Sequence, residues 1–325
     1  MDDSFQRSPI GIIGAGLMGT GIASVFAAAG RDVILFDEDP RRLKEVPNRI
    51  ADIGKELTQA GLVEAHIQDL THHVQTSDTI SGLGATHFLI EAIPEIPELK
   101  QSLYARLESV IASSAILTSN TSGLMPSKLA EKLKHPERFL VAHFWNPPHA
   151  IPLVEIVPSP SSQKKAVDST IHLLESIGME PVLVEREIPG FIGNRLQYAV
   201  LREALAIVRS GAASPEAVDR VMKNSLGRRY ATVGPIETAD LGGLDTFLTI
   251  ASHLMPELAK DEDVLQLIKV KVDAGNTGVR TGQGFYQWSP ERALSVIGNR
   301  NADLLRRRVV DKGLHTTRAH RKNGE

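Results

Sequence analysis

Two side chains twelve residues apart, His143 and Glu155, offer the clearest acid–base chemistry in the sequence. His143 ends the apolar run F-L-V-A-H, Glu155 lies in the run L-V-E, and both runs are typical of buried strands. Pro147 and Pro148 lie between the runs and predict a reversal of the chain. A reversal there would let the carboxylate orient the imidazole and stabilise its cation, as an orienting group does for a general base. The alternative is an ordinary core histidine, which is the default for most of the 11 histidines.

His149 is the rival histidine, and its proline-flanked loop predicts an exposed side chain. His143 and His149 do not share a helix, so their spacing does not indicate a metal site. The sequence has no cysteine, which excludes a disulfide, a thiol nucleophile and a cysteine-ligated metal. We therefore expect acid–base chemistry without a metal.

A glycine-rich turn, G-A-G-L-M-G, follows the first apolar run and precedes an alanine-rich helical stretch. In a dinucleotide-binding unit Gly14 allows the tight turn, Gly16 lets a pyrophosphate approach the backbone, and Gly19 lets the helix pack on the strand. The helix N-terminus then points free N–H groups at the phosphates. Asp37 ends the next strand, where a carboxylate accepts from the ribose 2′-OH of NAD and repels the 2′-phosphate of NADP. The predicted NAD-binding residues here are Gly14, Gly16, Leu17, Met18, Gly19 and Asp37.

Arg41 and Arg42 follow this acid, and arginines in that place can bind the 2′-phosphate of NADP. The more ordinary interpretation is that both are solvated residues in the first turn of a helix. We therefore expect NAD as the cofactor.

Strands and helices alternate from Ile10 to Val184, which predicts a doubly wound, mainly parallel Rossmann-like sheet covered on both faces. One helical stretch between these strands is expected over residues 64–70. Ligands bind beyond the carboxyl ends of such strands, and polar residues follow three of them: near Glu91, at S-N-T-S, and at His143. After Pro189 the sequence predicts only helices. We expect an NAD-binding domain over residues 1–187, a smaller helical substrate and dimerisation domain over 188–290, and a basic helical or frayed tail over 291–325.

Composition narrows the class of protein. The 36 basic and 39 acidic residues give a net charge of −3, whereas nucleic-acid-binding proteins usually have an excess of basic residues. No apolar run reaches the length of a membrane span, and the polar first residues lack the apolar core of a signal peptide. We expect a soluble cytoplasmic protein that binds neither nucleic acid nor membrane.

Several specific motifs lie between Ile10 and about Trp288, among them G-A-G-L-M-G, E-A-I-P-E, S-N-T-S, H-F-W-N-P, L-V-E and P-G-F-I-G-N-R. With these motifs the chain resembles the 3-hydroxyacyl-CoA dehydrogenases. The resemblance implies that His143 takes the proton from the substrate 3-hydroxyl and that Glu155 orients it. It also implies a homodimer built largely from the helical domain. The implied substrate contacts are Ser122 and Asn194, and the implied further cofactor contacts are Glu95, Lys100, Asn120 and Asn146.

Within this family the chain is most similar to the L-gulonate 3-dehydrogenases, whose relatives include lambda-crystallin. The stretches N-P-P-H-A-I-P-L-V-E and G-R-R-Y-A-T-V-G-P-I-E-T carry this similarity, and the substrate in that branch is a free hydroxy acid. The segments T-G-Q-G-F-Y and G-G-L-D look like the acyl-CoA branch instead. Arg228 and Arg229 are candidates to bind a free carboxylate, and their alternative is a solvated turn.

Three hypotheses follow. The first is an NAD-dependent dehydrogenase that oxidises the 3-hydroxyl of an L-3-hydroxy acid. The second is an L-3-hydroxyacyl-CoA dehydrogenase of the 3-hydroxybutyryl-CoA type, which would belong to fatty acid metabolism. The third comes from another class: an NAD-binding, crystallin-like structural protein without turnover.

Overall fold

A computed structural model describes residues 8–63 and 70–322, with side chains up to residue 313. By its internal contacts the chain divides into two units. Unit 1 comprises Met1–Ile192 and Ile297–Glu325, and unit 2 comprises Gly193–Val296. The helical stretch expected over residues 64–70 lies outside the described residues, except for Leu70, which opens a short 3-10 helix.

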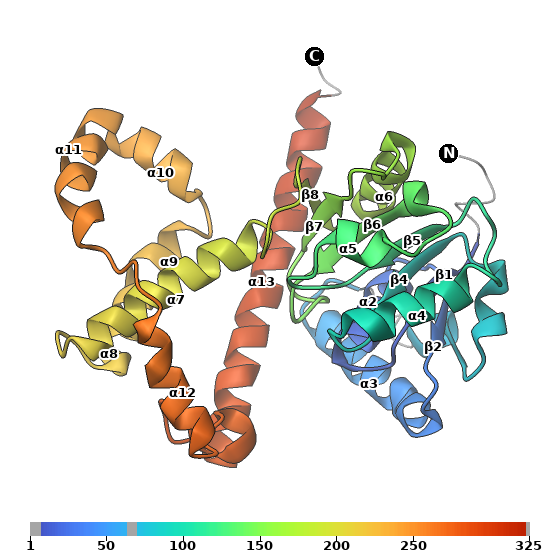
Figure 1. Cartoon of the computed structure of the whole chain (residues 1–325), viewed down its shortest axis with the longest axis horizontal. Coiled ribbons are helices and arrows are strands. Elements are labelled where there is room, and N and C mark those ends of the chain that lie inside the picture. Colours follow the sequence, from blue (N-terminus) through green and yellow to red (C-terminus); the bar gives the residue numbers. More distant parts are fainter. Residues whose placement is uncertain (1–7, 64–69, 323–325) are drawn as a thin grey trace. The chain divides into compact units, whose positions relative to one another are not determined.

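Unit 1 contains one eight-stranded sheet in the order β3-β2-β1-β4-β5-β6-β7-β8 (Figure 1). All neighbouring strands are parallel except β6 and β7. This arrangement confirms the doubly wound, mainly parallel sheet. The strands are β1 (Ile10–Ile13), β2 (Val33–Phe36), β3 (Val74–Ser77), β4 (Phe88–Glu91), β5 (Ile116–Ser119), β6 (Phe139–Phe144), β7 (Leu153–Pro158) and β8 (Glu180–Leu183).

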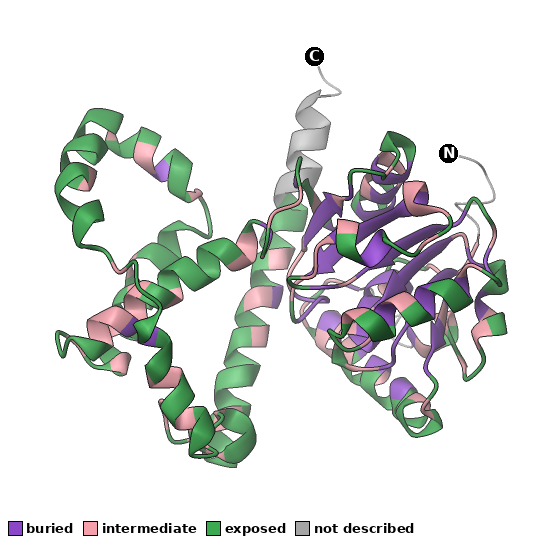
Figure 2. Cartoon of the chain, viewed as in Figure 1, coloured by how far each residue is buried: buried purple, intermediate pink, exposed green. Residues whose placement is uncertain are grey.

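Helices cover both faces of the sheet, because successive side chains of its buried strands point to opposite faces. Ile12 lies in the core cluster under α2, α3 and α6, whereas its neighbour Ile13 lies in the cluster under α4 and α5. The inner strands are accordingly buried, the edge strands β3 and β8 are more exposed, and the helices are exposed on their outer sides (Figure 2). The helices are α2 (Leu17–Ala28), α3 (Pro40–Gln59), α4 (Pro97–Leu107), α5 (Pro126–Ala130) and α6 (Lys164–Ser176).

Unit 2 consists of helices, as the sequence predicts. Ser214 caps α8 by accepting from the Ala217 N–H, and Pro215 occupies the first helical position. The boundary expected near residue 188 stays a prediction, and the division by contacts falls after Ile192. The helices are α7 (Gly193–Arg209), α8 (Pro215–Asn224), α9 (Leu226–Arg229), α10 (Pro235–Gly242), α11 (Leu244–Leu254), α12 (Gln266–Asp273) and the first turns of α13 (Pro290–Lys322).

From Ile297 onward α13 belongs to unit 1. Leu305 is buried in the core cluster that also holds α2 and α3. Arg308 donates to the carbonyl oxygens of His149 and Gly178 at 2.9 and 3.0 Å. Of the two forms expected for the tail, the structure shows a helix that reaches Lys322. Among the residues that the structure describes, no helix is long and apolar enough to cross a membrane.

Candidate active site

His143 and Glu155 meet across the antiparallel pair β6 and β7, where they are direct partners in the register. The His143 Nδ1 donates to Glu155 Oε2 at 2.9 Å, and both residues are buried, with 4% and 1% of their surface exposed. The expected chain reversal therefore brings the two side chains together. An Nδ1–H held by a carboxylate leaves Nε2 as the proton acceptor of a neutral imidazole. The catalytic roles themselves stay predictions.

Glu155 has two further donors that the sequence analysis missed. The Trp145 indole Nε1 donates to Oε2 at 3.2 Å, and the Ile192 backbone N–H donates to Oε1 at 2.9 Å. Trp145 stands inside the H-F-W-N-P motif and could have been noticed there. The Ile192 contact could not have been predicted, because every residue except proline has a backbone N–H and the sequence does not show which one will reach Glu155.

The glycine-rich turn has the geometry that a dinucleotide requires. Gly14 has a φ of 104°, which disfavours any L side chain. A Cβ added to Gly19 would lie 1.7 Å from the Gly14 carbonyl oxygen, so only glycine fits there. A Cβ added to Gly16 would meet nothing within 4 Å, so space for a phosphate remains over that backbone. Leu17 is exposed at the start of α2, and Met18 packs partly into the core.

The Asp37 carboxylate is held in place at the end of β2. Its two oxygens accept from the backbone N–H groups of Ala15 and Asp39, each at 2.8 Å. Arg42 is exposed in the first turn of α3, as the more ordinary interpretation expects, and its guanidinium lies 3.6 Å from Asp37 Oδ2. Arg41 is exposed and pairs with Asp39, and the hydrogen bonds from Arg41 lower the pKa of Asp39 to about 2.

A cavity of about 660 Å³ lies against this turn and α3. Its lining includes Gly16, Thr20, Arg42, Arg49 and His149. The open backbone at the turn suits the pyrophosphate of a dinucleotide. The residues present therefore fit NAD.

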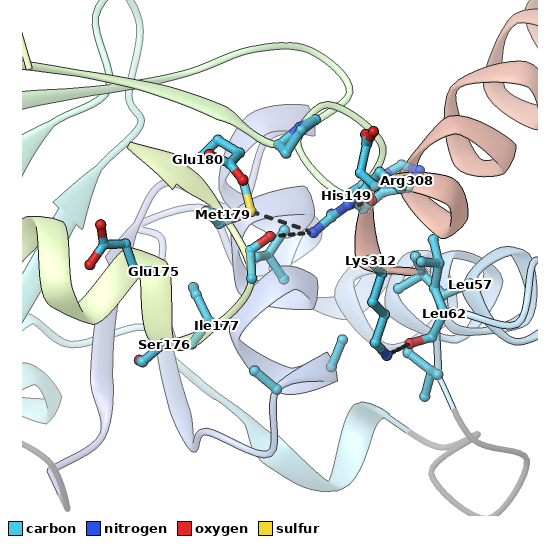
Figure 3. Close-up of a pocket in the computed structure, with 17 residues that line it drawn as sticks. Leu57, Leu62, His149, Glu175, Ser176, Ile177, Met179, Glu180, Arg308 and Lys312 are labelled. Carbon is cyan, nitrogen blue, oxygen red and sulfur yellow. Dashed lines mark hydrogen bonds between the residues drawn. The ribbon is translucent and has the colours of Figure 1, made fainter. Parts of the chain in front are cut away.

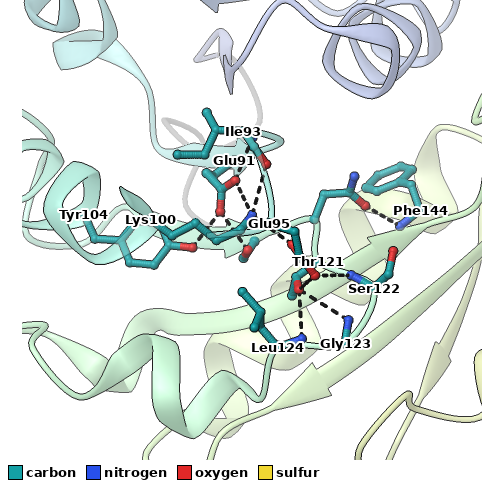
Figure 4. Close-up of polar contacts among 12 residues, drawn as sticks. Glu91, Ile93, Glu95, Lys100, Tyr104, Thr121, Ser122, Gly123, Leu124 and Phe144 are labelled. Carbon is teal, nitrogen blue, oxygen red and sulfur yellow. Dashed lines mark hydrogen bonds and ion pairs between the residues drawn. The ribbon is translucent and has the colours of Figure 1, made fainter. Parts of the chain in front are cut away.

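A buried polar network lies at the end of β4 (Figure 4). Glu91 accepts from the Lys100 ammonium at 2.6 Å, from the Tyr104 hydroxyl at 2.6 Å and from the Ser119 hydroxyl at 2.7 Å. Burial, and then the charge of Glu91, raises the pKa of Tyr104 well above its usual value. Lys100 has no exposed surface, and its ammonium also lies 3.5 Å from Glu95. Its expected contact with the cofactor stays a prediction.

Glu95 in turn fixes the S-N-T-S turn after β5 (Figure 4). Its Oε1 accepts from the Thr121 hydroxyl and from the Ser122 backbone N–H, the latter at 3.0 Å. Asn120 Oδ1 accepts from the Phe144 N–H at 2.9 Å, next to His143. The structure thus connects the turn that carries Ser122 with the strand that carries the histidine. The sequence analysis had singled out E-A-I-P-E and S-N-T-S without finding these bonds.

The prediction that His149 is exposed was wrong. His149 is 7% exposed, and its Nε2 lies 3.3 Å from Glu56 Oε2. The loop that contains Pro148 and His149 packs closely against α2, because a Cβ added to Gly21 would lie only 2.6 Å from the Pro148 ring. Burial lowers the pKa of His149, and Glu56 opposes this shift. Asn146, in the same loop, is exposed.

A larger cavity, of about 1000 Å³, lies between the ends of α2, α3 and α6 and the helix α13 (Figure 3). Its lining includes His149, Met179, Arg308 and Lys312. None of the residues predicted to act on substrate or cofactor lines it. The larger cavity is therefore not the predicted active site.

The remaining predicted substrate residues lie in unit 2. Asn194 is in the first turn of α7, and Arg228 and Arg229 are exposed at the end of the short helix α9. Their contacts with substrate stay predictions. Among the side chains that the structure describes, in residues 8–63 and 70–313, no three His, Cys, Asp or Glu form a group that could hold a metal ion.

The two units coincide closely with two family models. The model for the 3-hydroxyacyl-CoA dehydrogenase NAD binding domain matches residues 9–188, and the model for the 3-hydroxyacyl-CoA dehydrogenase C-terminal domain matches residues 190–288. The chain belongs to the 3-hydroxyacyl-CoA dehydrogenase family. This finding confirms the resemblance seen in the motifs.

Several relatives are similar over much of the chain. The 5-formyl-3-hydroxy-2-methylpyridine 4-carboxylate 5-dehydrogenase of Mesorhizobium japonicum is 32% identical, over 94% of this chain and 98% of its own. The lambda-crystallin homolog of Homo sapiens is 42% identical, over 71% of this chain and 73% of its own. A crystal structure of a 5-formyl-3-hydroxy-2-methylpyridine 4-carboxylic acid 5-dehydrogenase, described as an NAD⁺-dependent dismutase, has a TM-score of 0.88 and 30% identity, covering 94% of this chain and 99% of that one.

Family membership and the fit of the glycine-rich turn agree on the class of reaction. The protein is an NAD-dependent oxidoreductase of the 3-hydroxyacyl-CoA and hydroxy acid dehydrogenases, which act on CH–OH groups. NAD as the cofactor is likewise confirmed.

Proposed function

We propose that the protein oxidises the 3-hydroxyl of a gulonate-like L-3-hydroxy acid, with a free carboxylate, to the 3-keto compound. The observation that carries this proposal is the buried His143–Glu155 pair, with Nδ1 bonded to the carboxylate at 2.9 Å. This pair sits at the strand ends where ligands bind in doubly wound sheets.

The chemistry follows from the tautomer that the pair selects. Glu155 holds the Nδ1–H of His143, so Nε2 is the atom that takes the proton of the 3-hydroxyl. The same carboxylate stabilises the imidazolium that forms. The Ser122 hydroxyl and the Asn194 amide are proposed to hold the reacting oxygen. NAD, when bound, accepts the hydride that leaves C3.

Two features support a free acid over a coenzyme A thioester. Two cations of α3 are already paired, Arg49 with Glu45 and Lys55 with Asp52, so they are less available to coenzyme A phosphates. The relative from Mesorhizobium japonicum is named for a substrate that has a free carboxylate, 5-formyl-3-hydroxy-2-methylpyridine 4-carboxylate. We further propose that Arg228 or Arg229 binds the carboxylate as a charge-assisted pair. The acyl-CoA alternative is supported by the family itself and by the segments T-G-Q-G-F-Y and G-G-L-D.

A homodimer is part of the proposal. Helix α11 presents a stripe of Leu244, Phe247, Leu248 and Leu254 at helical spacing, and all four are exposed. Exposed apolar stripes of this kind mark protein–protein interfaces. We propose that the α11 stripe of one protomer packs against unit 2 of a second copy of the chain. We also propose that the protein is cytoplasmic.

One assay separates the candidates. NADH formation should be measured with L-gulonate and with L-3-hydroxybutyrate, each at several concentrations, and with (S)-3-hydroxybutyryl-CoA. We expect the higher kcat/KM for a free acid. A far higher value for the thioester would replace this proposal with the acyl-CoA one. NADH binding without turnover on any of the three would support a structural, crystallin-like role.

A further inference from the structure

The segment P-G-F-I-G-N-R, in which the chain passes from unit 1 to unit 2 after Ile192, contains an unusual backbone conformation. Phe191 has a φ of 51°, and among the described residues it is the one non-glycine with a positive φ. Bulky L side chains rarely adopt this left-handed region, because their Cβ crowds the backbone. Glycine would remove the steric cost, so the Phe191 ring must be stabilised by what it contacts. Strained backbone of this kind gathers at functional sites.

The Phe191 ring contacts the catalytic histidine. It is fully buried in a small cluster with Val141, Val157 and Val184. Its centroid lies 5.7 Å from that of the His143 imidazole, at an interplanar angle of 58°. The Trp145 ring lies 5.6 Å from the same imidazole at 50°. Two aromatic rings therefore restrict the orientation of the imidazole.

The next backbone N–H reaches the catalytic carboxylate. Ile192 N–H donates to Glu155 Oε1 at 2.9 Å, while Trp145 Nε1 and His143 Nδ1 donate to Oε2 at 3.2 and 2.9 Å. Both carboxylate oxygens are thereby held. The direction of the Ile192 N–H depends on the conformation of Phe191, so the left-handed turn aims it at the carboxylate.

We propose that the Phe191–Ile192 turn and Trp145 are positioning groups for the catalytic pair. The turn and the indole fix the carboxylate of Glu155, and the two aromatic rings fix the plane of His143. Together they direct Nε2 toward the hydroxyl whose proton it takes. The inference rests on the proposed role of His143 as the base, and it assigns these residues no direct contact with substrate.

The first test replaces the ring. Phe191→Leu keeps an apolar side chain in the cluster but removes the planar surface against His143. We expect kcat with NAD and L-gulonate to fall about tenfold, because small misplacements of a catalytic group cost this much or more. The KM for L-gulonate and the NADH affinity should change less than about twofold. Val184→Ala is the matched control, since it truncates the same cluster without removing a ring from His143. It should lower the Tm and leave kcat intact.

The second test removes one hydrogen bond. Trp145→Phe keeps an aromatic ring and loses the indole N–H, so Glu155 Oε2 loses one of its hydrogen-bond donors. The carboxylate should then stabilise the imidazolium more strongly. The acid limb of the kcat–pH profile for oxidation should move to higher pH. A merely structural tryptophan would change the Tm and leave this profile in place.

The outcomes separate two failures. If Phe191→Leu and Trp145→Phe both keep kcat and the pH profile of the unmutated protein, the positioning role is wrong. If His143→Ala keeps its turnover, the proposed function is wrong instead. Should Phe191→Leu fail to fold, the more flexible Phe191→Met takes its place in the same comparison. Should (S)-3-hydroxybutyryl-CoA prove the substrate, it replaces L-gulonate in every measurement.

Discussion

The two units differ in what they bury. Unit 1 encloses the strands of its sheet between helices, and buried residues run through every helix from α2 to α6 (Figure 2). In the described part of unit 2, by contrast, the buried residues are Leu205, Thr238 and Val264. Helix α11 has no buried residue, although it is strongly apolar.

This difference separates two kinds of functional claim. His143, which is the proposed base, its partner Glu155 and the glycine-rich turn are held by contacts within unit 1. Unit 2, by contrast, carries exposed apolar side chains, and it contains the proposed substrate residues Asn194, Arg228 and Arg229. Chemistry assigned to unit 1 should therefore survive changes to the assembly better than specificity assigned to unit 2. The following variants test that contrast.

The largest effect is expected inside unit 1. His143→Ala should lower kcat by roughly two to four orders of magnitude, the usual loss for a general base. NADH affinity, measured by fluorescence titration, should stay nearly unchanged, because the glycine-rich turn is untouched. His172→Ala, an exposed histidine on α6, is the control and should behave as the unmutated protein. Near-normal turnover in His143→Ala would remove His143 from the mechanism.

A smaller effect is expected at the apolar stripe of unit 2. Leu248→Asp places a charge in the middle of the proposed dimer interface and should weaken the dimer by about a hundredfold or more. Sedimentation or light scattering across a dilution series would measure this. Leu248 is 69% exposed, so the folded chain itself should tolerate the change. Thr249→Asp, the next residue of α11, is the control. A dimer that is equally stable in both variants would place the interface elsewhere.

The arginines of α9 test specificity. Alanine at Arg228 or Arg229 should cost about 2 kcal/mol for a free acid, or some thirtyfold in kcat/KM, since a charged partner is lost. A thioester should be nearly unaffected because its carbonyl is neutral. Arg220→Ala on α8 is the exposed control. Equal losses for acid and thioester would argue against a carboxylate contact.

The smallest effect concerns the buried His149 of unit 1. Burial lowers its pKa in the folded state, so the unfolded chain takes up the proton first as the pH falls below about 6.5. Its contribution to stability is therefore present above that value and is lost below it. Urea unfolding at about pH 7 and about pH 5 should show a larger loss for the unmutated protein than for His149→Gln. The same loss in both would show that another group controls the acid limb of stability.

The sequence by itself determined the order of strands and helices in unit 1, the glycine-rich turn and the approach of His143 to Glu155. Each of these depends on residues that are close in the chain. Gly14 and Gly19 are required by one turn, and the two prolines after Asn146 reverse the chain between two neighbouring strands. Local spacing is enough to predict such features.

The tertiary structure decided the contacts between distant segments. Ile192 reaches Glu155 across 37 positions, and Arg308 reaches the carbonyl of His149 across 159. The burial of His149 follows from the packing of its loop on α2, and the burial of Lys100 follows from its bond to Glu91. No local periodicity encodes these contacts, because each depends on which elements the folded chain brings together. For that reason the sequence could predict that His143 and Glu155 form a pair, and only the fold showed which groups hold that pair in place.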